Sequence, residues 1–137
     1  PRDLRAIFLG VRINILEDDR GVEILAEGVV HGREVIDAHK RIYDERYLKR
    51  QRYQIVDKSA CTEYAVTADD IDAIAEMDRR ASTVNPDIVI AVVESSGLQF
   101  SLTELWQAHL AECTFLTKSF GDRQSAMQWI SENAKKP

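Results

Sequence analysis

The sequence contains few of the residues on which metal and redox sites are built. It has two cysteines and three histidines among 137 residues. Cys61 and Cys113 form neither a CxxC pair nor any zinc-binding spacing, and His109 with Cys113 supplies two ligands where a closed zinc site needs four. We therefore expect free thiols, no metal site and no cofactor, although the spacing leaves a disulfide between the two cysteines open.

Long apolar runs and an excess of positive charge are also missing. No run approaches the roughly 18 apolar residues of a membrane-spanning helix, and no signal-peptide pattern precedes the first expected strand. The formal net charge is -5, which disfavours a broad nucleic-acid-binding face. These features predict a cytoplasmic protein that neither spans a membrane nor binds nucleic acid. One basic cluster, interrupted by acidic residues, is interpreted as the solvated face and end of a helix: Lys40, Arg41, Arg46, Lys49, Arg50 and Arg52.

The motifs of common enzyme classes are absent as well. There is no GxSxG, no GxGxxG and no phosphate-binding glycine loop. Ser59, Cys61 and Thr62 follow a predicted strand, but a nucleophile needs a base within hydrogen-bond reach. The sequence does not place His31 or His39 there, and we expect His39 to be a satisfied, partly buried side chain. The protein is predicted not to be an enzyme.

What the sequence does contain is an alternation of strand and helix periodicities. Residues 11–16 and 22–30 alternate apolar and polar positions, which predicts a hairpin, and residues 4–9 add a short strand or a packed lead-in. Further strands are expected at 53–57, 88–93 and 114–120, and helices at 32–48, 67–80, 97–111 and from 122 onward. The order β-β-α-β-α-β-α-β-α predicts an α/β fold, with a single layered domain over residues 1–137 and a mostly parallel central sheet.

Local signals sharpen this prediction at three places. The run from Ile88 to Val93 is apolar on both faces, which is typical of a central strand covered on both sides. Thr67 is expected to cap a helix, with acidic residues in the first turn. Asp122 is expected to cap the last helix. Residues 58–66 read as a loop or an irregular extended segment.

Two stretches of the chain resemble a known family. They are YQIVDKSACTEYAVTADDI and LTELWQAHLAECTFLTKSFGDRQSAMQWI, which are similar to the STAS domains of anti-sigma-factor antagonists and in particular to the SpoIIAA-like branch. The second resembles that branch's usual ending, F-x-D-x-x-x-A-x-x-W-I/L, here Phe120, Asp122, Ala126, Trp129 and Ile130. The resemblance spans residues 11–133. Its motifs are mainly structural, so it implies a fold far more than a function.

The resemblance also bears on the serines of residues 93–102. In a regulatory STAS domain, a DSSG-like motif at the start of the second helix carries the phosphorylated serine. Here residues 66–71 hold that place, and ESSG at 94–97 lies one strand later. Neighbouring carboxylates oppose a further negative charge at both places, so helix capping is the preferred interpretation. The candidate phosphoacceptors are Thr67, Ser95 and Ser96.

Polar residues at strand ends give a candidate binding site. In open parallel sheets, ligands usually bind at the carboxyl edge, where Asp57 ends a predicted strand. Asp57, Ser59, Thr67 and Ser95 are therefore a candidate ligand or partner edge. The alternative is that these four residues cap helices and turn the chain.

Three hypotheses about function follow. The first is a regulatory module that binds a protein partner, with a homodimer as one form of this. The second is a binding module for a small apolar or lipid-like molecule, since STAS-like chains resemble the Sec14 lipid carriers in strand order. It requires a closed apolar cavity between helices and sheet. The third is a phosphoswitch that acts on a kinase-like partner.

Overall fold

A six-stranded sheet forms the centre of the computed structural model, which describes residues 5–8, 10–95 and 97–136. Its strands follow their order in the sequence; β2 pairs antiparallel with β1 and with β3, and the pairs from β3 to β6 are parallel. The mostly parallel α/β fold with an N-terminal antiparallel part is thus confirmed. The strands are β1 (Arg5–Phe8), β2 (Val11–Leu16), β3 (Gly21–His31), β4 (Tyr53–Ala65), β5 (Val89–Val93) and β6 (Leu116–Phe120).

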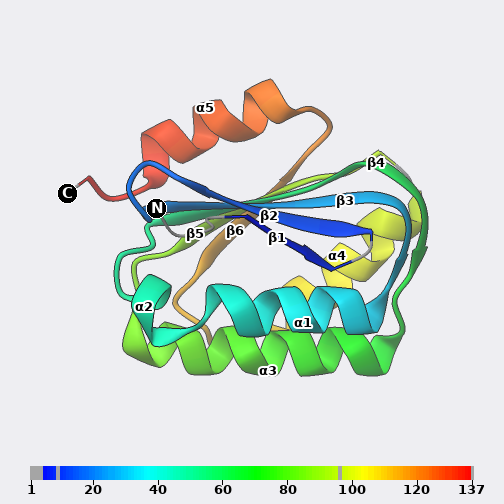
Figure 1. The fold of residues 1–137 in the computed structure, drawn as a ribbon, viewed down its shortest axis with the longest axis horizontal. Coiled ribbons are helices and arrows are strands. Elements are labelled where there is room, and N and C mark those ends of the chain that lie inside the picture. The colour runs from blue at the N-terminus through cyan, green and yellow to red at the C-terminus, as the bar shows by residue number, and fades with distance from the viewer. Residues whose placement is uncertain (1–4, 9, 96, 137) are drawn as a thin grey trace.

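The helices divide unequally between the two faces of the sheet (Figure 1). Because the strand order never reverses, right-handed crossovers place every connecting helix on the same face. That face carries α1 (Gly32–Ile42), α2 (Glu45–Leu48), α3 (Ala68–Val84) and α4 (Gly97–His109), and the opposite face carries α5 (Arg123–Asn133). No helix within the described ranges is long and apolar enough to cross a membrane.

Strand β5 lies between the two helical layers, as its composition predicted. Ile90 and Val92 belong to the large apolar core under α1, α3 and α4, whereas Val89, Ala91 and Val93 join the smaller core under α5. All five residues of the strand are buried. The alternation explains why this stretch shows no polar face.

Of the two alternatives predicted for residues 58–66, the loop was wrong and the irregular extended segment is confirmed, because β4 runs well past the predicted strand end at residue 57. Strand β4 continues from Tyr53 to Ala65 and pairs with β3 as far as His31, across two register shifts. Gly28, in the left-handed region at φ 66°, stands at one of these shifts. Because β5 pairs with β4 only up to Asp57, most of the remaining residues of β4 have solvent access, while Lys58 and Tyr64 stay buried under the helices. Polar side chains are tolerated at the accessible positions, and the strand loses its hydrophobic signature.

The single helix predicted over residues 32–48 is also two elements. Helix α1 ends at Ile42, and the short helix α2 begins after Asp44, whose carboxylate accepts a hydrogen bond from the Arg46 amide. Tyr47 and Leu48 of α2 are buried, so apolar residues continue past the break and the sequence does not mark it. Smaller differences are that α3 runs on to Val84 and that the last strand begins at residue 116. The predicted lead-in at residues 4–9 contains β1.

Candidate functional site

An open groove lies between α1 and α2 on one side and α3 on the other. We call it the α2–α3 groove, and its volume is about 660 Å³. Its apolar lining comes from α2 and α3, and most of its charged lining residues are cations. The lining residues are Lys40, Tyr43, Glu45, Leu48, Lys49, Met77, Arg80, Ala81 and Val84.

The break between α1 and α2 builds one wall of this groove. Helix α2 lies beside the C-terminal end of α3 (Figure 1). The buried Asn85 side chain, just after α3, donates hydrogen bonds of 2.7 and 2.8 Å to the carbonyls of Leu48 and Gln51. The side-chain amide of Gln51, through Nε2, in turn donates to the Ile42 carbonyl at 2.6 Å. These buried bonds hold α2 against α3, so the groove has a fixed shape.

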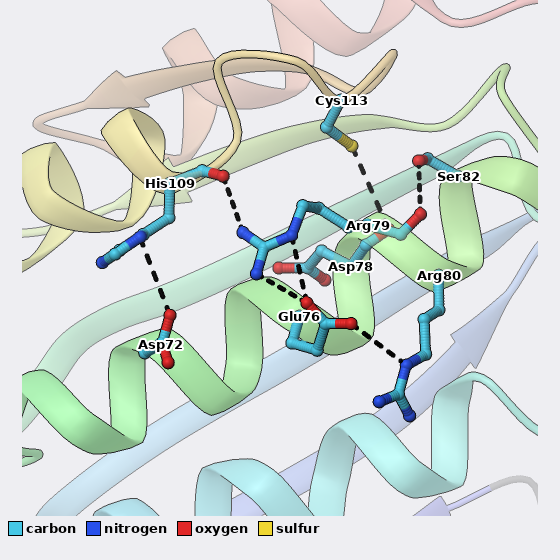
Figure 2. Close-up of polar contacts among 8 residues, drawn as sticks. All are labelled: Asp72, Glu76, Asp78, Arg79, Arg80, Ser82, His109 and Cys113. Carbon is cyan, nitrogen blue, oxygen red and sulfur yellow. Dashed lines mark hydrogen bonds and ion pairs between the residues drawn. The ribbon is translucent and has the colours of Figure 1, made fainter.

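The groove combines exposed apolar surface with unneutralised positive charge. Val84 is 53% exposed. Arg80 pairs with Glu76 at 3.2 Å on the surface of α3 (Figure 2). Lys40 and Lys49 are exposed, and no ion pair reaches either within the described ranges. In a chain with a net charge of -5, this is a local reversal of sign.

A second space lies inside the fold, between the sheet and helices α1, α3 and α4. We call it the helix–sheet cavity; its volume is about 40 Å³. A cavity of roughly 150 Å³ is needed for a ligand the size of benzene, so this one cannot hold an acyl chain. Its apolar walls are Val35, Val56, Ile71, Ile74, Val92 and Leu102, and its polar or aromatic walls are His39, Lys58, Tyr64, Thr103 and Trp106.

Lys58 brings a buried amine to this cavity. Its Nζ donates to Thr103 Oγ1 at 3.2 Å and lies 4.4 Å from the centre of the Tyr64 ring. Thr103 Oγ1 donates in turn to Glu94 Oε2 at 2.7 Å. Burial lowers the pKa of Lys58 to about 8, against an opposing effect of the Glu94 charge. The other Glu94 oxygen is buried and has no hydrogen-bond partner in the described part of the chain.

Asp78 forms a second buried network beside the cavity. Its carboxylate accepts hydrogen bonds from Tyr43 Oη at 2.5 Å and from Trp106 Nε1 at 2.7 Å. His39 Nε2 lies 3.9 Å away, and His39 Nδ1 lies 2.9 Å from the Val35 carbonyl. Burial raises the pKa of Asp78, although these partners oppose the shift. The network ties α1, α3 and α4 together, and His39 is satisfied as predicted.

The surface of α3 adds further ties to α4 (Figure 2). Arg79 donates to the His109 carbonyl at 2.8 Å and pairs with Glu76, while His109 Nδ1 lies 3.8 Å from Asp72.

Cys113 and Cys61 are free thiols, as expected. Within the described residues, no group of three or more His, Cys, Asp or Glu side chains is arranged to hold a metal ion.

The predicted edge residues separate into distinct environments. Ser59 donates to Asp57 Oδ1 through its amide and its hydroxyl, at 2.9 and 2.6 Å. Asp57 lies on the α5 side of the sheet, where Arg123 is 3.8 Å from its Oδ2 and also pairs with the buried Glu23. Thr67 lies beyond the far end of β4, eight residues past Ser59, so it does not share this environment.

Of the candidate phosphoacceptors, Thr67 is shown to cap a helix, and Ser95 lies just before the start of α4. Thr67 caps α3 as predicted: its hydroxyl accepts from the Asp70 amide at 3.1 Å, and Asp70 accepts from the Thr67 amide at 3.0 Å. The exposed Ser95 donates its amide to Gln99 Oε1 at 3.1 Å. Ser96 lies outside the described residues. Phosphorylation at any of the three stays a prediction that rests on the resemblance.

Four buried polar residues of the helical layer were missed at the level of sequence: Lys58, Asp78, Glu94 and Thr103. A signal did exist for two of them. Glu94 directly follows the fully apolar strand β5, and Lys58 occupies an inward position of β4. A charge that continues an apolar strand pattern indicates a buried ionic group. The partners remained hidden because Lys58 and Thr103 are 45 residues apart.

Comparison with known proteins identifies the fold. No family model and no curated protein sequence matches the chain. A solved structure does match: an uncharacterized protein from Shewanella loihica PV-4, of the DUF3478 family and described as having a SpoIIAA-like fold. It is 14% identical, with a TM-score of 0.52, and the match covers 94% of this chain and 97% of that one. The expectation of a SpoIIAA-like architecture is confirmed, and the chain has the SpoIIAA-like fold.

Proposed function

We propose that this chain is a non-catalytic regulatory module that binds a partner protein through the α2–α3 groove. The observation that carries the proposal is the groove itself. It offers about 660 Å³ of open space with apolar side chains from two helices. Exposed apolar surface with a polar rim is a common mark of a protein interaction site.

The charges of the groove indicate the partner. Three of its four charged lining residues are cations, Lys40, Lys49 and Arg80, and the fourth is Glu45. A groove with apolar walls commonly accepts the apolar face of an amphipathic helix. Acidic residues flanking that face would meet the lysines and be attracted to them. The partner that fits is therefore an amphipathic helix rich in Asp or Glu.

A peptide pair tests this proposal directly. A helical peptide of Leu and Glu, with Leu at positions i, i+3, i+4 and i+7, is compared with its twin in which every Glu is Lys. Fluorescence anisotropy should show binding of the Glu peptide only, weakening as salt rises because the lysines are exposed. Equal binding of the Lys peptide, or binding of neither, would contradict the proposal.

Variants place the binding site. Val84→Asp and Lys49→Glu should each weaken binding of the Glu peptide at least ten-fold. Lys118→Glu, which changes an exposed lysine on β6, is the matched control and should leave binding of the Glu peptide unchanged.

Light scattering completes the test by measuring the oligomeric state. A dimer that Val84→Asp dissociates would assign the groove to a second copy of this chain and overturn the acidic-partner proposal.

A further inference from the structure

The groove does not account for the amine inside the fold. Lys58 is 5% exposed and lines the helix–sheet cavity. Buried lysines are uncommon, and their ammonium groups are normally paired directly with a carboxylate. Here a hydroxyl, Thr103 Oγ1, stands between the amine and the Glu94 carboxylate. The amine also faces the Tyr64 ring, which leaves it one donor directed at neither group.

We propose that Lys58 is a reactive amine that takes small aldehydes into the helix–sheet cavity as a reversible imine. The ligand class follows from charge. Because Glu94 already balances the Lys58 charge, an added carboxylate would bring an unpaired negative charge into a buried site. A neutral carbonyl compound avoids that cost and offers an acceptor to the amine.

The lysine environment favours nucleophilic attack. Amines in apolar surroundings are activated because burial disfavours the ammonium form. With a pKa of about 8, roughly one Lys58 in ten is neutral at pH 7. An exposed lysine with the ordinary pKa is neutral in fewer than about one molecule in a thousand.

The reaction balances with the groups that are present. The neutral Nζ attacks the carbonyl carbon, a C–N bond forms, and the carbonyl electron pair moves to oxygen. The resulting carbinolamine loses its oxygen as water, whose two hydrogens come from the amine, and a C=N bond remains. Thr103, which joins the amine to Glu94 by hydrogen bonds, can pass protons between them. When the imine is protonated, its positive charge keeps Glu94 as a partner.

The volume of the cavity limits the size of the ligand. About 40 Å³ corresponds to roughly three water-sized groups. A carbonyl compound of one or two carbons, with two or three heavy atoms in all, fits that space, and an aromatic aldehyde does not. Binding of this kind is reversible capture without turnover, and it is independent of whether the α2–α3 groove binds a partner.

Reductive trapping tests the proposal on the intact protein. The chain is incubated with acetaldehyde and sodium cyanoborohydride at pH 7, and modified lysines are mapped by mass spectrometry. Lys58 should be modified at least ten-fold faster than the exposed Lys49 and Lys118. The pH dependence of the Lys58 rate should show a midpoint near 8. Modification of Lys58 no faster than the two surface lysines would overturn the proposal.

Two controls separate the cavity from general reactivity. Benzaldehyde should label the surface lysines but not Lys58 in the unaltered protein, and equal labelling of Lys58 by both aldehydes would contradict a size-limited site. Leu102→Trp, which fills the cavity, should reduce Lys58 labelling to the level of Lys49 while circular dichroism stays unchanged. Persistence of fast Lys58 labelling in a folded Leu102→Trp protein would also count against the proposal.

Discussion

The indole Nε1 of Trp106 lies 2.7 Å from Oδ2 of Asp78, a carboxylate with 0% exposure. The other oxygen of Asp78 accepts from Tyr43 at 2.5 Å. Asp78→Ala would leave both donors buried without an acceptor, and each such group costs about 1–3 kcal/mol. We expect the free energy of unfolding to fall by roughly 2–4 kcal/mol, since removing the buried charge offsets part of the loss. Urea denaturation followed by circular dichroism measures it.

Asp72→Ala is the matched control for that variant. Asp72 lies on the same helix but is exposed, and its carboxylate lies 3.8 Å from His109 Nδ1. An exposed pair of this kind contributes about 0–1 kcal/mol. If the two variants lost the same stability, the buried network would not be what joins the three helices.

Lys58 should make stability depend on pH. Its pKa is lowered to about 8 by burial, so the folded chain binds fewer protons than the unfolded chain between about pH 8 and the ordinary pKa near 10.5. Stability must therefore rise with pH across that window, and the penalty is full below it. Relative to Lys58→Met, the unaltered protein should gain roughly 2 kcal/mol between pH 7 and pH 9.5. Urea titrations of both proteins at the two pH values measure the difference.

The Lys58→Met comparison carries its own check. Tyr64 is also buried, and burial raises its pKa, so it affects both proteins in the same way and cancels. A constant difference in stability between Lys58→Met and the unaltered protein at all pH values would show that the Lys58 ammonium is not penalised by burial.

Gly21 and Tyr53 are in contact across the junction of β3 and β4. A Cβ at residue 21 would lie 2.2 Å from Cζ of the buried Tyr53 ring. Because the ring is packed between β-sheet and α5, Gly21→Ala should cost about 1–3 kcal/mol, the usual penalty of overpacking. Gly121→Ala, where a Cβ meets nothing within 4 Å, should be close to neutral. Thermal unfolding of the two variants tests the contact.

Thr67 has a structural role that is separable from phosphorylation. Its hydroxyl accepts from the Asp70 amide at 3.1 Å at the start of α3. Thr67→Val removes that oxygen and should cost about 1 kcal/mol, whereas Thr67→Ser keeps it and should cost little. Chemical denaturation distinguishes the two. Equal stability of the Val and Ser variants would mean that the cap contributes nothing measurable.

The sequence predicted those features whose signal is local. Thr67 and Asp122 were expected to cap helices and do so, because a capping side chain bonds to an amide three residues away. The run at residues 88–93 was expected in a central strand, because burial on both faces removes every polar position. The extension of β4 to Ala65 gave no such signal, since its outer part has polar residues with solvent access.

Order of elements, helix caps and the buried central strand were thus determined by the amino-acid sequence itself, through periodicity and short-range hydrogen bonding. The unbroken strand order, the one-sided placement of the crossover helices, the α2–α3 groove and the Lys58–Thr103–Glu94 network were decided by tertiary structure. The physical reason is range. Contacts between residues tens of positions apart depend on how strands pair, and strand pairing is set by the packing of the whole sheet rather than by any one segment.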